Sequence, residues 1–149
     1  MIRLVDALAD PAAARAAALD EFRSGGLVVL PTETVYGLAV LPSGPRAVDG
    51  MFRRKGRSDN RPVAVLVADV DQARTVVEPG PAFELLAAAF WPGPLTVVTT
   101  RGVGFSARLG GDQASVGVRC PDHELVRALA AEVGPLAVTS ANRSGRPTE

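Results

Sequence analysis

Hydrophobic residues in this chain gather in short, valine-rich runs, and segments with helical spacing separate these runs. Short continuous apolar runs are typical of strands that are covered on both faces. The predicted strands span residues 27–30, 62–68, 95–100, 115–119 and 136–140, and the predicted helices span residues 11–24, 45–55, 70–78, 81–91 and 121–133. Because strands and helices alternate, we predict a single α/β domain with a twisted, partly parallel sheet.

Helix start and stop signals support these boundaries. Asp10 and Pro11 stand in the order expected of an N-cap and a first helical residue, and the Gly25-Gly26 pair follows the last turn. Asp69 is a second predicted N-cap. Residues 101–114 are rich in glycine and predict a loop.

Composition narrows the class of protein. The 149 residues are 47% hydrophobic and 21% charged, as expected of one globular domain with a single core. The one cysteine, Cys120, has no partner for a disulfide within the chain, and no His/Cys cluster predicts a metal site. We therefore expect a reducing compartment, the cytoplasm. No stretch approaches the roughly 18 apolar residues of a membrane span, so we expect no membrane partner.

Charge is balanced overall but clustered locally. Sixteen Lys and Arg residues offset sixteen Asp and Glu residues, so the total charge favours no polyanionic partner. The segment RRKGRSDNR, residues 53–61, nevertheless holds five cations and one acid. Such a run is usually a solvated surface. In the alternative reading, Lys55 and Arg57 converge on one phosphate from an extended backbone, and Gly56 lets that phosphate approach the main chain.

Polar segments follow three of the predicted strands. They are PTETVYG (31–37), RCPDH (119–123) and SANRSG (140–145). Functional groups in α/β sheets gather beyond the carboxyl ends of strands, so these segments are candidates for a site. Each is also typical of a plain turn whose side chains satisfy local backbone groups.

Two residue pairs within these segments carry alternative readings. In extended chain, Ser140 and Asn142 point to the same side and would bind polar groups of a ligand together. Cys120 and His123 have the spacing of a thiolate pair, but a buried cysteine and a solvent-facing histidine fit their positions better.

Five motifs together resemble one known family. LPTETVYGL, KGR, FWPGPLTVV, VGVRCP and TSANRSG occur in the order and spacing of the threonylcarbamoyl-AMP synthase family, the YrdC-like domain. The resemblance extends from about Gly25 to Pro147. It implies a sheet with a concave basic surface, and condensation of L-threonine, bicarbonate and ATP to threonylcarbamoyl-AMP plus pyrophosphate, for the t6A modification of tRNA.

The resemblance also implies roles for individual residues. The positions that bind threonine in the family correspond to Thr32, Tyr36, Arg119 and Ser140. The positions that contact the nucleotide correspond to Lys55, Arg57, Ser115 and Asn142, of which Lys55 and Arg57 are the candidate catalytic residues. No metal ligand is implied, and Mg²⁺ is expected to arrive with ATP. Such a reaction needs positioning and charge neutralisation more than covalent catalysis.

The chain departs from the family pattern at several points. Ser58 stands where the family has a proline, and VAVLVAD (63–69) lacks a histidine that many members carry. Members usually continue past the SANRSG motif, so we expect residues 1–149 to be a YrdC-like domain lacking the usual C-terminal part. Two other functions stay open: a non-catalytic module that binds tRNA or double-stranded RNA on the same basic surface, and the carbamoyl-transfer domain of a hydrogenase maturation protein. Other proteins of the t6A pathway are further expected partners.

Overall fold

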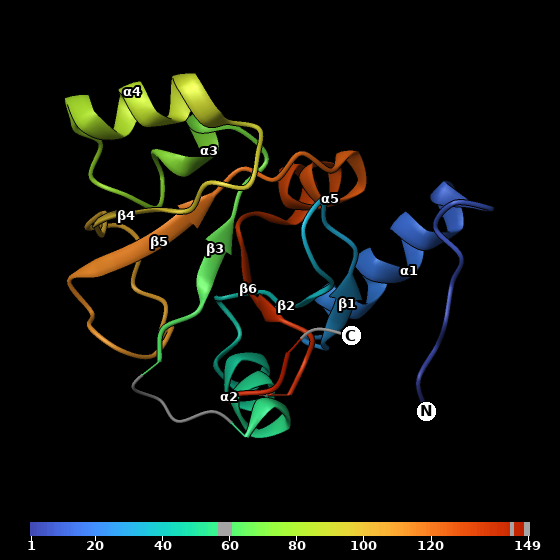
Figure 1. Ribbon diagram of the computed structural model, residues 1–149. Helices are drawn as coiled ribbons and strands as arrows, with labels where there is room; N and C mark the ends of the chain where they lie inside the picture. The colour runs from blue at the N-terminus through green and yellow to red at the C-terminus, as the bar shows by residue number, and fades with distance from the viewer. Residues whose placement is uncertain (57–60, 144, 148–149) are drawn as a thin grey trace.

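Five helices and six strands make up the fold shown in Figure 1, a computed structural model that describes residues 1–56, 61–143 and 145–147. The helices are α1 (Pro11–Arg23), α2 (Pro45–Lys55), α3 (Val70–Ala73), α4 (Pro81–Phe90) and α5 (Glu124–Val133). The strands are β1 (Val28–Leu30), β2 (Gly37–Val40), β3 (Ala64–Leu66), β4 (Val97–Thr100), β5 (Ser115–Arg119) and β6 (Leu136–Ser140).

The strands form one mixed sheet in the order β1-β2-β6-β3-β5-β4. Among the strands of the described residues, β3 and β5 are parallel, and every other neighbouring pair is antiparallel. The prediction of a partly parallel sheet is therefore confirmed. Since β5 runs opposite to β6, the carboxyl ends of these two strands lie at opposite ends of the sheet. The polar segments that follow them consequently cannot meet at one sheet edge, contrary to the simple expectation for α/β folds.

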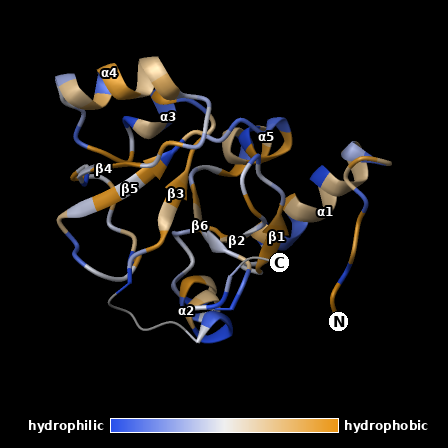
Figure 2. Cartoon of the chain, viewed as in Figure 1, coloured by the Kyte–Doolittle hydropathy of each residue, from blue (hydrophilic) through white to orange (hydrophobic). Residues whose placement is uncertain are grey.

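Two hydrophobic clusters cover the two faces of the sheet (Figure 2). One face packs against α2, α3 and α4 through residues such as Met51, Val65 and Phe83. The other face packs against α1 and α5, with Phe22 and Leu129 in the centre of that cluster. Each fully buried side chain of this size contributes about 1.5–3 kcal/mol of transfer free energy.

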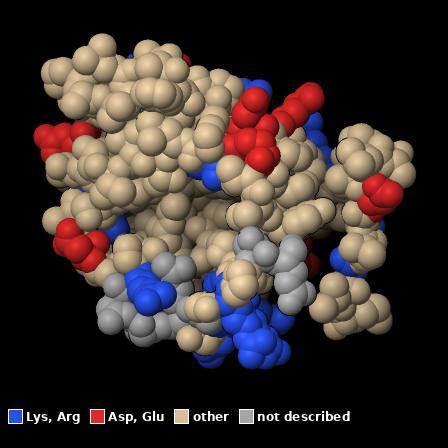
Figure 3. All heavy atoms as spheres, viewed as in Figure 1, with Lys and Arg blue, Asp and Glu red and all other residues tan. Residues whose placement is uncertain are grey.

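The helices α1 and α5 leave part of their face of the sheet uncovered. The residues on this open face are neither exposed nor fully buried: Ala64, Ser115, Gly117, Arg119, Val138 and Ser140. At Gly37 of β2, an added Cβ atom would lie 2.6 Å from Cγ1 of Val138. Glycine is therefore needed here, because a side chain would collide with the floor of the open face. The central hollow in Figure 3 lies on this side of the molecule.

Most element boundaries agree with the sequence prediction, and the exceptions have local causes. The carboxylate of Asp10 accepts a hydrogen bond from the amide of Ala13 at 2.9 Å, as expected of an N-cap. The predicted helix after Asp69 is wrong in length, because α3 ends at Ala73. Strand β2 was not predicted, since its four residues follow a polar loop and show no long apolar run.

Candidate ligand site on the open face of the sheet

The loop of residues 31–36 leaves β1 and is held in shape by one hydroxyl group. Oγ1 of Thr32 donates to the carbonyl oxygen of Val35 at 2.6 Å and accepts from the amides of Thr34 and Val35, each at 3.2 Å. The reading of this segment as a turn whose hydroxyls satisfy local backbone is therefore confirmed for Thr32. These three bonds use the donor and both acceptor positions of the hydroxyl, whose oxygen also lies 3.0 Å from Oγ1 of Thr34, so the hydroxyl is committed to the shape of the loop.

Arg119, at the carboxyl end of β5, connects this loop to the turn after α4. Its Nε donates to the carbonyl oxygen of Gly93 at 3.0 Å, and its Nη1 donates to Oγ1 of Thr34 at 3.1 Å. Its Nη2 pairs with the carboxylate of Glu33. The side chain of Arg119 is only 12% exposed, which weakens solvent screening of its charge. A planar cation fixed in this way is suited to bind a carboxylate or a phosphate.

Lys55 is the last residue of α2 and lies almost entirely inside the protein, with 7% of its surface exposed. Its Nζ donates to the carbonyl oxygens of Ser140, at 2.6 Å, and of Asn142. The reading of a solvated charge run is therefore wrong for Lys55, although Arg53 and Arg54 beside it are exposed. The predicted 45–55 helix is confirmed, and Gly56 after it is left-handed, with φ 58°, so the extended backbone that the alternative reading required is absent at these two residues.

Arg57, the second cation of the predicted pair, lies outside the described residues. Its convergence with Lys55 on one phosphate stays a prediction.

The segment after β6 closes against the 31–36 loop. The amide of Ala141 donates to the carbonyl oxygen of Tyr36 at 2.8 Å, next to the paired residues Gly37 and Ser140. The ring of Tyr36 itself is 64% exposed. This contact ties the first polar motif to the last one.

Asn142 lies beyond the end of β6, so it does not continue the extended strand with Ser140 as predicted. Its Nδ2 donates to the carbonyl oxygens of Arg143, at 3.4 Å, and Arg146. Its Oδ1 is buried and has no hydrogen-bond partner. A buried acceptor without a partner costs about 1–3 kcal/mol, so a ligand or water that donates to this oxygen would be stabilised.

Ser115 lies at the amino end of β5, toward the same end of the sheet as Ser140. The amide of Ala114 donates to the Asp112 carboxylate at 2.8 Å and lowers the pKa of that carboxyl most, and the nearby Ser115 hydroxyl lowers it further. Ser115 thus has a carboxylate as a neighbour, at the far end of β5 from Arg119.

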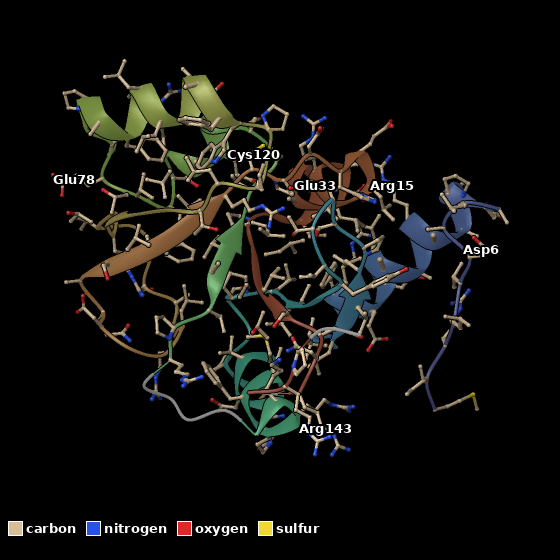
Figure 4. The ribbon with its side chains drawn as sticks, viewed as in Figure 1. Asp6, Arg15, Glu33, Glu78, Cys120 and Arg143 are labelled. Carbon is tan, nitrogen blue, oxygen red and sulfur yellow. The ribbon has the colours of Figure 1, made fainter. Side chains whose placement is uncertain are left out.

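Charge is distributed unevenly around the hollow in Figure 3. Lysine and arginine side chains gather below it, over α2, whereas acidic side chains lie around the upper part of this view. The basic side chains of the last turn of α2 are Arg53, Arg54 and Lys55. In Figure 4, Arg143 lies toward α2 and Glu33 toward α5.

Cys120 and His123 do not form a reactive pair. Sγ of Cys120 is buried and donates to the carbonyl oxygen of Ala68 at 3.4 Å, and burial raises the pKa of this thiol. The prediction of a solvent-facing histidine is wrong, because His123 is partly buried and its Nδ1 is enclosed without a partner.

The raised pKa of Cys120 has a measurable consequence. A raised pKa keeps the thiol protonated near pH 8, and only the thiolate is alkylated. We therefore expect native protein to react with iodoacetamide at least tenfold more slowly than protein unfolded in urea, in which the pKa is ordinary. Equal rates in the two states, followed by mass spectrometry, would contradict the burial of Cys120.

Three residues that build this site were not predicted from the sequence. They are Glu33, Thr34 and Gly93, the partners of Arg119. The signal for Glu33 was its carboxylate in a polar loop directly after a buried strand. Nothing in the sequence indicated which cation it would meet, because Arg119 is 86 residues away.

Within residues 1–56, 61–143 and 145–147, no group of three or more His, Cys, Asp or Glu side chains is arranged to hold a metal ion. None of the helices in that part of the chain is long and apolar enough to cross a membrane.

The fold and site define a class of protein: an α/β domain in which helices leave part of one sheet face uncovered. The 31–36 loop lies over this open face, and the hydrogen-bonded cations Arg119 and Lys55 lie beside it. Comparison with known proteins then gives the family. The chain belongs to the family of Sua5, YciO and YrdC proteins, whose model carries the description "Telomere recombination" and matches residues 20–149. The resemblance predicted from the motifs is thereby confirmed.

Curated relatives are about 40% identical to this chain over the aligned residues. The threonylcarbamoyl-AMP synthase of Bacillus subtilis is 39% identical over 142 residues, covering 93% of this chain and 40% of the relative. The threonylcarbamoyl-AMP synthase of Homo sapiens is 42% identical over 135 residues, covering 87% and 47% respectively. The chain thus spans less than half the length of these two relatives.

A solved structure supports the same fold. The crystal structure of Sua5 from P. abyssi complexed with L-threonine matches with a TM-score of 0.83 and 37% identity. The match covers 90% of this chain and 40% of that chain.

Proposed function

We propose that this protein is a threonylcarbamoyl-AMP synthase, which condenses L-threonine, bicarbonate and ATP into threonylcarbamoyl-AMP and pyrophosphate. The product would serve the t6A modification of tRNA in the cytoplasm. One observation carries the proposal: hydrogen bonds link the polar motifs around the open face. Arg119 bonds to the 31–36 loop, Tyr36 bonds to Ala141, and Lys55 bonds to Ser140 and Asn142.

The geometry suits substrates that carry several negative charges. In this proposal Arg119 binds the carboxylate of threonine, and the loop shaped by Thr32 encloses the amino acid beside Tyr36 and Ser140. The nucleotide occupies the side of the open face near Ser115, Asn142 and the cations of α2. Family membership at about 40% identity and the L-threonine bound in the P. abyssi structure support these assignments.

The chain's own residues would contribute position and charge. The amine of threonine takes up CO2 as a carbamate, whose oxygen attacks the α-phosphorus of ATP in line while pyrophosphate leaves. Lys55, together with Arg57, would neutralise the phosphate charge that spreads in the transition state. No carboxylate cage for a metal exists among the described residues. Mg²⁺ would therefore be held mainly by the triphosphate, where it would screen the leaving group.

The proposal is tested by incubating the protein with ATP, L-threonine and labelled bicarbonate. We expect labelled adenylate and an equal amount of pyrophosphate, and no pyrophosphate when threonine or bicarbonate is omitted. Pyrophosphate release that does not depend on threonine would contradict the proposal.

Thr32 gives a sharper test of the site. Replacing Thr32 with valine removes the hydroxyl that shapes the 31–36 loop but keeps the volume of the side chain. We expect threonine binding, measured by calorimetry, to weaken about tenfold, because one to two hydrogen bonds of the loop are lost. Thr32→Ser keeps the hydroxyl and should bind within about threefold of the original protein. Equal weakening by both variants would contradict this prediction, because the methyl group of Thr32 would then matter as much as its hydroxyl.

A second candidate function, binding of tRNA or double-stranded RNA, is favoured by the exposed cations near α2. They are Arg46, Arg53, Arg54, Arg61, Arg143 and Arg146. If RNA binds there, its affinity should fall steeply with salt, and the double variant Arg53→Glu, Arg54→Glu should weaken binding further. Threonine binding should change little when salt is raised or when the double variant is used. An RNA affinity that is unchanged by the double variant would remove this candidate.

A further inference from the structure

Among the ion pairs of the described residues, the pair between Glu33 and Arg119 is the most enclosed, and the proposed chemistry assigns no role to Glu33. The side chains of Glu33 and Arg119 are 24% and 12% exposed, whereas the arginines of the surface pairs are 42–58% exposed. Glu33 comes from the loop over the open face and Arg119 from its floor. The pair therefore lies at the edge of the open face, within reach of a ligand that binds there; Glu33 is labelled in Figure 4.

The orientation of Arg119 is fixed without using its full capacity for hydrogen bonds. Its contacts to Gly93, Thr34 and Glu33 need three of the five N–H groups of an arginine. A ligand carboxylate can therefore approach this guanidinium without displacing Glu33. The pair does not have to break for a ligand to bind.

Coulomb's law then predicts which ligand the pair favours. A simple carboxylate is attracted by Arg119 but repelled by Glu33, and at similar distances these two effects largely cancel. The zwitterion of an α-amino acid can place its carboxylate beside Arg119 and its ammonium group beside Glu33. The four charges then alternate in sign, and every close contact is attractive.

We infer that Glu33 binds the α-ammonium group of an amino-acid substrate while Arg119 binds its carboxylate. The pair thus selects amino acids over carboxylic acids that lack the amino group. This inference rests on the proposed function only in taking an amino acid as the substrate. Glu33 would bring the amine to a defined position over the open face, where the amine must react.

The test compares two ligands that differ only in the amino group. L-Threonine and (3R)-3-hydroxybutanoate are titrated into the full chain in a calorimeter. We expect the original protein to prefer threonine by about 10- to 100-fold, the value of one charge-assisted hydrogen bond. In Glu33→Gln, the affinity for threonine should fall by a similar factor, while 3-hydroxybutanoate should bind as tightly as to the original protein, or more tightly. The preference of Glu33→Gln for threonine over 3-hydroxybutanoate should therefore be no more than about threefold.

Two further variants serve as controls. Glu33→Asp retains the carboxylate and should keep part of the preference for threonine. Glu78→Gln removes the same charge from an exposed side chain, which Figure 4 shows well away from Glu33, and should keep the full preference.

Several outcomes would overturn the inference. If Glu33→Gln binds both ligands more tightly by the same factor, Glu33 only competes with ligands for Arg119. A preference that is unchanged in Glu33→Gln, or absent from the original protein, equally rules out an ammonium contact. The ratio of the affinities for threonine and 3-hydroxybutanoate in the original protein needs no variant. It therefore tests the inference even if Glu33→Gln does not fold.

The adenylate assay separates this inference from the proposed function. Amine-selective binding that depends on Glu33, without adenylate formation, would retain the inference and reject the function. Adenylate formation with an unchanged preference in Glu33→Gln would retain the function and reject the inference.

Discussion

Replacing Lys55 with methionine is expected to lower both the stability of the fold and the rate of adenylate formation. Methionine fills the buried space but leaves the carbonyl oxygens of Ser140 and Asn142 without the ammonium group that binds them. We expect a loss of about 1–3 kcal/mol in the free energy of unfolding, measured by urea denaturation. Turnover should fall by about 10²–10³, as when one preorganised donor is removed from a transition state.

The neighbouring residue provides the control. Arg54→Met removes the same charge one position earlier in α2, where the side chain is exposed. It should change the free energy of unfolding by less than about 0.5 kcal/mol. If Lys55→Met were as stable as Arg54→Met, the two buried hydrogen bonds would contribute nothing. Full turnover in Lys55→Met would remove Lys55 from the proposed site.

The second large effect is expected at Arg119. Arg119→Lys keeps the positive charge but cannot hold Gly93, Thr34 and Glu33 at once, because lysine lacks the planar fork of donors. We expect threonine affinity to fall by about 100-fold in calorimetry, since both the carboxylate contact and the anchored loop are lost. The catalytic efficiency kcat/KM for threonine should fall at least as much.

Arg23→Lys is the matched control for this variant. Arg23 forms an ion pair with Glu132 on the surface, where 58% of its side chain is exposed, and such pairs contribute little. Its threonine affinity should equal that of the original protein. Retained affinity in Arg119→Lys would mean that charge alone suffices at this position.

The sequence predicted the elements whose signals are local. The first helix was predicted because Asp10, Pro11 and the Gly25-Gly26 pair mark its ends, and these residues lie in the helix or next to it in the sequence. Strand β2 was missed because its four residues show no long apolar run, and its pairing with β6 depends on residues about a hundred positions away. Long-range pairing of this kind leaves little trace in a short window of sequence.

The sequence predicted which residues belong to the candidate site but not how these residues are arranged in space. The polar motifs pointed to Thr32, Arg119 and Ser140, yet parallel strands alone would have brought them to one sheet edge. The mixed sheet instead separates the carboxyl ends of β5 and β6, and the 31–36 loop spans the distance. Burial of Lys55 could not be predicted either, because a run of cations is usually solvated. The carbonyl oxygens of Ser140 and Asn142, at and just after the end of β6, make its burial favourable.

The position of β6 in the sheet has a consequence for how the chain folds as it is synthesised. This strand follows every other strand of the described sheet in sequence, yet it lies between β2 and β3 and pairs with both. Without β6, the pairings of the sheet leave β1 and β2 as one small hairpin, and β3, β5 and β4 as a separate three-stranded unit. Each would present an unpaired edge that can aggregate. We therefore expect the sheet and its open face to be completed only when residues 136–140 insert.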